Sequence, residues 1–141
     1  MTVAYAVLAD LYVFGLPLVA MGSVSTATQQ RVLDARNDFA DDKMRARYKL
    51  PLQAPYPDSL KMHICMLAAW DILMIRGYNP SAAADVNIAT RGELATKWFD
   101  DVERQRAHPN VIESSSPDAP GYAAPLVISK ALQGWYPGTG R

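Results

Sequence analysis

Residues 26–52, TATQQRVLDARNDFADDKMRARYKLPL, decide the fold, because they read as one long helix with a defined start and end. Thr26 and Gln29 have the spacing of a capping box, in which two side chains satisfy free backbone amides at a helix start. Pro51 has no amide hydrogen and favours an extended conformation for the residue before it, so we expect the helix to end near Tyr48. The rest of the chain is expected to cover this helix or to extend from it.

Apolar side chains fall on two flanks of this helix when its residues are placed at about 100° per residue. One flank carries Val32, Ala35, Phe39, Ala46 and Leu50, and the other carries Leu33, Ala40, Met44 and Tyr48. A helix on the outside of a monomer normally shows one apolar stripe. Either the helix is wedged between two neighbours of its own chain, as is common in small bundles, or one flank meets another subunit. The second alternative predicts a subunit contact through Phe39, Met44 and Tyr48.

Length and charge narrow the class of protein. A chain of 141 residues suits one domain with one core, and half of the residues are hydrophobic. Fourteen basic and fourteen acidic residues cancel, which argues against a general nucleic-acid binder. A local basic run remains, and its usual explanation is a solvated helix end that complements the helix dipole. The run consists of Lys43, Arg45, Arg47 and Lys49.

The chain shows no sign of secretion or of membrane insertion. Cys65 is the single cysteine, which excludes an intramolecular disulfide and fits a reducing compartment. Asp10 interrupts the first apolar run, so we expect no secretory leader. The most apolar stretch, residues 62–75, is shorter than the roughly 20 residues that a membrane span requires.

Before the long helix, residues 7–14 predict a short helix that Gly15 ends. Residues 15–25 follow as an apolar loop that we expect to be packed against the core. After the long helix, the three prolines of residues 51–57 predict a stiff connector.

Two more helices are expected in the second half. One runs from Asp58 or Ser59 to about Arg76, with Gly77 as its stop, and its apolar residues point in almost every direction, which is typical of the buried centre of a bundle. A connector over residues 77–89 then leads to a helix over 91–107. Thr90 and Glu93 form its capping box, and Leu94, Ala95, Trp98, Phe99 and Val102 form its apolar stripe. Trp70, Leu73, Trp98 and Phe99 should be buried together.

The composition changes at Pro109. Residues 109–141 hold five prolines and four glycines, with apolar side chains spread among them. The sequence therefore predicts an all-α fold: a small helical bundle over residues 1–108 with a long central helix, followed by an extended Pro/Gly-rich C-terminal arm over 109–141. Apolar residues outside a core favour a partner surface. The residues expected to bind a portal protein or a neighbouring subunit are Leu126, Ile128, Leu132, Trp135 and Tyr136.

No catalytic or metal-binding motif is recognisable, so we expect neither an enzyme nor a cofactor or metal site. His63 is interpreted as a histidine at the edge of the core. Asp71 is unusual in an apolar helix, and we expect it to pair with a basic residue of the long helix. The candidates are Arg36, Lys43 and Arg47.

The order of segments resembles the Mu-like prophage head–tail connector family, which comprises small helical phage proteins. The N-terminal YAVLADLYVFG, the long helix and the apolar helix ending in IRGY all contribute to the likeness. The family's aromatic–x–Leu–Pro–Leu signature is matched by Tyr48, Leu50, Pro51 and Leu52. Its closing Ser–basic–x–x–Leu–x–Gly–aromatic segment resembles Ser129, Lys130, Leu132, Gly134 and Trp135.

The resemblance implies a structural role in the virion neck. Such proteins look like adaptors that dock beneath the portal, form a homo-oligomeric ring and continue the DNA channel toward the tail. The implied ring is a dodecamer, and the implied partners are the portal, a stopper or tail-terminator protein, and packaged DNA that passes without sequence recognition. The protein would be made in the host bacterial cytoplasm. Channel-facing or DNA-near residues would then be Lys43, Arg45, Arg47 and Lys49.

Two other classes remain open at this point. One is a head-closing stopper or a tail-terminator ring component; such proteins are usually rich in strands, whereas this sequence reads as helical. The other is a small helical DNA-binding regulator that uses residues 43–49, and it predicts duplex DNA binding that weakens steeply with salt.

Overall fold

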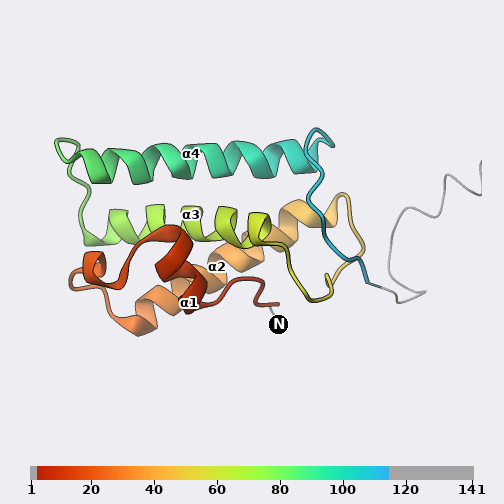
Figure 1. The fold of residues 1–141 in the computed structure, drawn as a ribbon, viewed down its shortest axis with the longest axis horizontal. Helices are drawn as coiled ribbons and strands as arrows, with labels where there is room; N and C mark the ends of the chain where they lie inside the picture. Colours follow the sequence, from red (N-terminus) through yellow and green to blue (C-terminus); the bar gives the residue numbers. More distant parts are fainter. Residues whose placement is uncertain (1–2, 115–141) are drawn as a thin grey trace, which may run out of the picture.

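The computed structural model describes residues 3–114, and every regular element in that range is helical, which confirms the predicted fold class. Three long helices form the bundle: α2 (Thr26–Arg45), α3 (Asp58–Arg76) and α4 (Ala83–Glu103). α3 and α4 run antiparallel side by side, and α2 crosses α3 obliquely (Figure 1). Three short elements precede them: α1 (Leu8–Asp10), the π-helical turn η1 (Leu11–Gly15) and the 3₁₀ turn η2 (Leu18–Met21).

The long helix α2 begins at Thr26, as the sequence indicates, but its capping residue differs and it ends earlier than predicted. Ser25, not Thr26, is the cap: its hydroxyl oxygen accepts a hydrogen bond from the amide of Thr28 at 3.2 Å. The helix ends at Arg45, and the amides of the next turn donate to the carbonyl of Met44. The chain therefore leaves the helix several residues before Pro51, and this turn supplies the Met44 carbonyl with hydrogen-bond donors.

One face of α2 is buried, and it packs against α3, α4 and the N-terminal segment. The buried residues are Gln29, Leu33, Asn37, Ala40 and Met44. On the predicted flank that begins at Val32, Phe39 is half-buried and Ala35 is exposed. The first flank is therefore only partly covered within the chain, and both alternatives for it stay open. The polar Asn37 belongs to this face because its side chain accepts hydrogen bonds from the amides of Tyr5 and Ala6, at 3.2 and 3.1 Å, and holds the N-terminal segment.

α3 is the centre of the bundle, as its apolar sequence predicts, and Gly77 ends it with a positive φ of 116°. Gly15 lies against its middle. A Cβ atom on Gly15 would sit 2.7 Å from the carbonyl oxygen of Cys65, so only glycine allows η1 to approach α3 this closely. Gly15 therefore ends the first helical segment, as predicted, and also sets its distance from α3.

The predicted connector over residues 77–89 and the predicted capping box of Thr90 and Glu93 are both wrong. The helix begins at Ala83, so most of residues 77–89 is helical, and Thr90 lies inside it with its hydroxyl donating to the carbonyl of Val86 at 3.0 Å. Asp85 in the first turn explains the early start, because its carboxylate accepts a hydrogen bond from the amide of Asn79 and complements the helix dipole. The helix ends at Glu103 instead of residue 107.

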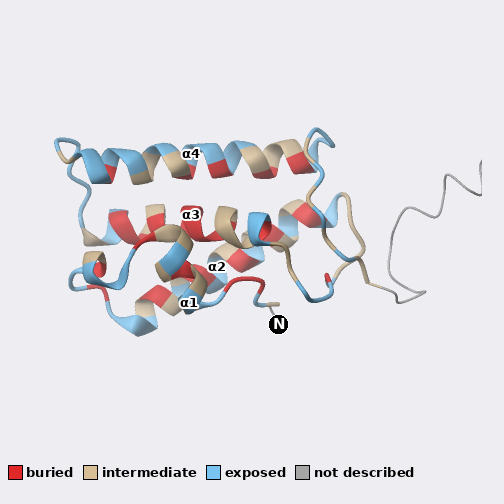
Figure 2. Ribbon diagram, in the orientation of Figure 1, coloured by how far each residue is buried: buried red, intermediate tan, exposed pale blue. Residues whose placement is uncertain are grey.

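The predicted aromatic core is only partly correct. Leu73 and Phe99 are fully buried, whereas Trp70 and Trp98 are half-buried at the edge of the core. The Trp98 ring stacks on His63, with centroids 4.0 Å apart, and meets Phe99 edge-on. Buried residues line the inward sides of the helices (Figure 2).

The apolar loop before α2 also differs from its prediction. Leu16 and Met21 are buried, but Leu18 and Val19 of η2 are 59% and 92% exposed. Leu94 on the outer side of α4, predicted in its apolar stripe, is likewise 57% exposed. The sequence therefore overestimates how much of its apolar surface is buried within one chain.

Candidate interaction surfaces

The two ends of the bundle differ in chemistry. The charged end comprises two stretches of the chain. Residues 43–49 include the end of α2 and the turn after it, and residues 100–108 include the end of α4 and the residues after it. The neutral end comprises η2, the last turn of α3 and the first turn of α4. Arg76 connects the three elements of the neutral end, as described below.

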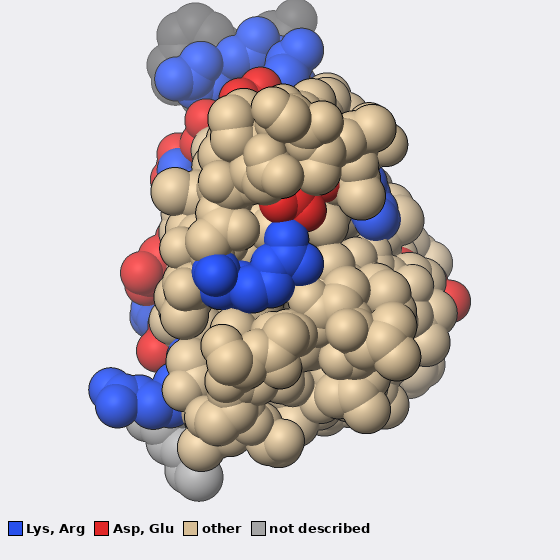
Figure 3. All heavy atoms as spheres, turned by 90° about the vertical axis from the view of Figure 1, so that its left-hand side faces the viewer, with Lys and Arg blue, Asp and Glu red and all other residues tan. Residues whose placement is uncertain are grey.

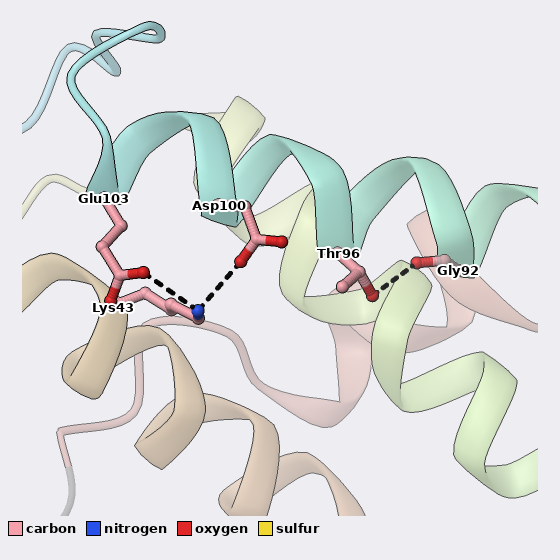
Figure 4. Close-up of polar contacts among 5 residues, drawn as sticks. All are labelled: Lys43, Gly92, Thr96, Asp100 and Glu103. Atoms are coloured by element: carbon pink, nitrogen blue, oxygen red, sulfur yellow. Dashed lines mark hydrogen bonds and ion pairs between the residues drawn. The ribbon is translucent and has the colours of Figure 1, made fainter.

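At the charged end, Lys43 joins α2 to α4. Its Nζ atom lies 2.9 Å from Asp100 Oδ1 and 3.2 Å from Glu103 Oε1 (Figure 4). The hydrogen bond from Lys43 lowers the pKa of Asp100, and the same contact raises the pKa of Lys43. The Lys43 side chain is therefore engaged within the chain and is 22% exposed.

The other basic residues of the run differ in exposure and in their contacts. Arg45 is exposed. Arg47 Nη2 lies 2.8 Å from His108 Nδ1, and its guanidinium sits 5.8 Å from the centroid of the Tyr48 ring. Lys49 is half-buried. Two of the four basic side chains, Lys43 and Arg47, thus make contacts inside the chain, and the predicted role near DNA stays a prediction for all four.

The three residues predicted for a subunit contact differ in how far they are buried. Met44 is fully buried in the core of its own chain, which leaves no side-chain surface for a neighbour in this fold. Phe39 is half-buried, with its ring edge-on to Phe99 at 5.5 Å between centroids. Tyr48 is half-buried near the charged end. A subunit contact through Phe39 and Tyr48 stays a prediction.

The beginning of the predicted arm lies against the charged end. Gln53 and Ile112 form an isolated antiparallel bridge, and the Ser114 amide donates to the Lys49 carbonyl at 3.1 Å. The division of the chain at residue 108 stays a prediction. The predicted partner-binding residues lie outside the described residues; they are Leu126, Ile128, Leu132, Trp135 and Tyr136.

Arg76 organises the neutral end. Its Nη1 donates to the carbonyl of Ala20 in η2 at 2.9 Å, and its Nη2 donates to Asp85 of α4 at 2.7 Å. The carboxylate of this ion pair is buried, with the Asp85 side chain 7% exposed, whereas the Arg76 side chain is 25% exposed. Three elements from distant parts of the sequence are thereby fixed beside one another.

Six large apolar side chains remain exposed on these three elements and on the connector between α3 and α4. They are Leu18 at 59%, Val19 at 92%, Met74 at 54%, Ile75 at 56%, Tyr78 at 36% and Val86 at 38%. Figure 3 views this end and shows a mostly neutral surface, with one basic and one acidic group touching near its middle and other charges toward its margins. Sequence reasoning missed this surface, although the apolar loop of residues 15–25 and the all-round apolar α3 were its signal.

Interior polar residues have structural partners. Asp71 pairs with Arg36, whose Nη2 lies 2.8 Å from Asp71 Oδ1, which confirms one of the predicted pairings. His63 lies at the core edge as predicted, and burial lowers its pKa. Burial also raises the pKa of the Cys65 thiol to about 12. Among residues 3–114 no group of three or more His, Cys, Asp or Glu side chains could hold a metal ion.

The family model of bacteriophage Mu Gp36 matches residues 9–124, from the first helical segment to beyond the described residues. The chain belongs to the bacteriophage Mu Gp36 family. This confirms the Mu-like phage part of the resemblance, whereas the connector role is not part of the match. No curated protein and no solved structure matches this Gp36-family chain. Within the described residues, no helix is both long and apolar enough to span a membrane.

Proposed function

We propose that this Gp36-family protein is a structural component of the phage neck: an adaptor subunit whose ring joins the portal to the tail and continues the DNA channel. The observation that carries the proposal is the neutral end, where six large apolar side chains stay exposed on a rigid framework. Contiguous apolar surface on a folded chain is typical of a protein interaction site. Membership of a phage family supplies the setting.

A ring requires each subunit to present two different, complementary surfaces, so that head-to-tail contacts close on themselves. The neutral and charged ends of the chain differ in chemistry, so a contact between the ends of successive subunits would join two different surfaces. The proposed ring is a dodecamer that follows the portal, and DNA would pass through it without sequence recognition. The proposed location is the head–tail interface of the virion.

Electron microscopy of the purified protein tests the proposal. Closed rings with a central hole wide enough for duplex DNA are expected, alone or after addition of the portal protein of the same phage. A protein that stays monomeric with and without the portal would contradict the proposal. Rings that bind tail proteins but not the portal would assign the chain to the stopper or tail-terminator class instead.

A DNA-binding regulator is distinguished by fluorescence anisotropy with a labelled duplex. The adaptor proposal expects no tight binding at physiological salt, because the net charge is zero and Lys43 and Arg47 contact their own chain. Tight binding that falls steeply as salt rises would support the regulator and contradict the adaptor.

A further inference from the structure

The neutral end presents exposed apolar side chains from elements that Arg76 joins. Arg76 fixes η2, α3 and α4 relative to one another, so the exposed apolar side chains are presented in one arrangement before any partner arrives. Val19 is almost completely solvent-exposed at 92%, and Ile75 at 56% belongs to the last turn of α3. A preorganised surface loses less entropy on binding than a flexible one. Its occupant should be apolar and should carry little charge, because the surface itself is mostly neutral (Figure 3).

The C-terminal part of this chain has the matching composition. Residues 119–129, APGYAAPLVIS, contain no charged residue, and Lys130 and Arg141 are the only charges after them. The apolar side chains Leu126, Val127, Ile128, Leu132 and Trp135 fall in this part of the sequence. Such a segment suits an uncharged apolar surface better than the charged end, where carboxylates and basic groups are concentrated.

The described chain ends far from the neutral end. The Gln53–Ile112 bridge and the Ser114–Lys49 hydrogen bond hold residues 112–114 at the charged end. α3 separates the two ends by about 28 Å, at 1.5 Å per residue over its 19 residues. Figure 1 shows the chain leaving the bundle at the side opposite to the turn between α3 and α4. The uncharged C-terminal segment therefore follows directly from residues that lie at the charged end, whose chemistry it does not match.

We propose that residues 119–136 of one copy dock on the neutral end of a neighbouring copy. The inference rests on the proposed ring. In a head-to-tail ring the charged end of each subunit faces the neutral end of the next, so the segment begins beside its binding surface. Docking on its own neutral end would require the segment to run back along the whole bundle. The contact also repeats at every subunit, which is the property that lets such an interface close.

Cysteine cross-linking of the full chain tests the docking. The native Cys65 is fully buried and does not compete for an oxidant that acts on exposed thiols. Val19→Cys and Leu132→Cys are made in two separately tagged chains, which are mixed and oxidised with diamide. We expect a disulfide-linked heterodimer in several-fold excess over the control mixture of Lys97→Cys with Leu132→Cys. Lys97 is a matched control because it is exposed on α4.

A chain that carries both Val19→Cys and Leu132→Cys distinguishes docking between copies from docking within one copy. Linear or ring-shaped intermolecular products are expected. A product that is wholly intramolecular would overturn the inference. Rings seen by electron microscopy without selective cross-linking would overturn the docking and leave the proposed function intact. A protein that is monomeric by mass with and without the portal protein, and gives no cross-link, would overturn both.

Discussion

The two ends of the bundle use charge in opposite ways. At the neutral end, an ion pair between Arg76 and the buried carboxylate of Asp85 joins α3 to α4, and large apolar side chains are exposed around it. At the charged end, Lys43 bridges Asp100 and Glu103 on the surface, where the two carboxylate side chains are 41% and 40% exposed. Exposed ion pairs stabilise a fold little. The neutral end therefore combines exposed apolar side chains with elements that are held together, whereas the charged end keeps its carboxylates in contact with water.

The largest effect should come from the core that both ends share. Phe99 is fully buried and contacts Phe39 and Trp98, so Phe99→Ala should lower the free energy of unfolding by about 3–5 kcal/mol. Urea denaturation measures the loss. Leu94→Ala, on the exposed side of the same helix, is the control and should change stability by less than about 0.5 kcal/mol. A loss below about 1 kcal/mol for Phe99→Ala would show that α4 does not pack as described.

The next effect concerns the contact between α3 and α4. Replacing a glycine inside a helix by alanine normally raises the free energy of unfolding by about 1 kcal/mol, because alanine is the better helix former. In Gly92→Ala the new Cβ would lie 2.9 Å from Trp70 Cβ, so the helices must separate. We expect a net destabilisation of about 1–3 kcal/mol, as for other overpacked sites. A thermal melt that shows higher stability for Gly92→Ala would disprove this close contact.

A smaller effect, with a distinctive pH dependence, is expected at the neutral end. The hydrogen bond from Arg76 lowers the pKa of Asp85 below its usual 3.8. A carboxylate with a lowered folded-state pKa stabilises the fold above its unfolded pKa and loses that contribution as pH falls through the folded value. Asp85→Asn should therefore lower the melting temperature at neutral pH, and the difference from the unmodified protein should shrink below about pH 4.

The exposed Asp42 supplies the comparison for this titration. Asp42→Asn should change the melting temperature little at any pH, because surface substitutions rarely matter. If Asp85→Asn gives a difference that stays constant from neutral to acidic pH, its charge is not what stabilises the neutral end.

The smallest effect is expected at the charged end. Lys43→Met removes the bridge to Asp100 and Glu103 and keeps most of the aliphatic side chain. We expect a loss of about 0.2–1 kcal/mol, as for other partly exposed ion pairs, and a smaller loss at high salt. Denaturation at low and at high salt measures it. A loss larger than that of Asp85→Asn at neutral pH would reverse the contrast between the two ends.

The parts of the fold that follow local rules could be predicted from the sequence. The apolar run of α3 and its stop at Gly77 gave the right bounds, and Asp71 found one of its predicted partners in Arg36. The start of α4 could not be predicted in the same way. In its first turn, Asp85 accepts hydrogen bonds from Asn79 and Arg76, six and nine residues earlier, an arrangement that no capping-box spacing marks.

The surfaces were harder to predict because periodicity does not distinguish a core from an interface. Met44 and Val19 are both apolar residues near the ends of the bundle, yet one is fully buried and the other is 92% exposed. The difference arises from packing: Met44 faces the chain's own core, whereas η2 is held at the surface by the Arg76 contact with Ala20. The neutral end was therefore visible in the sequence only as an apolar loop.

Sedimentation velocity of the full chain tests most directly whether the neutral end drives assembly. We expect the unmodified protein to sediment as an oligomer and Val19→Asp to sediment as a folded monomer, because a charge in an apolar contact is costly. Leu94→Asp, which places the same charge on another exposed apolar site, should leave the oligomer intact. The account would be contradicted if Val19→Asp assembled like the unmodified protein, or if Leu94→Asp dissociated the oligomer equally.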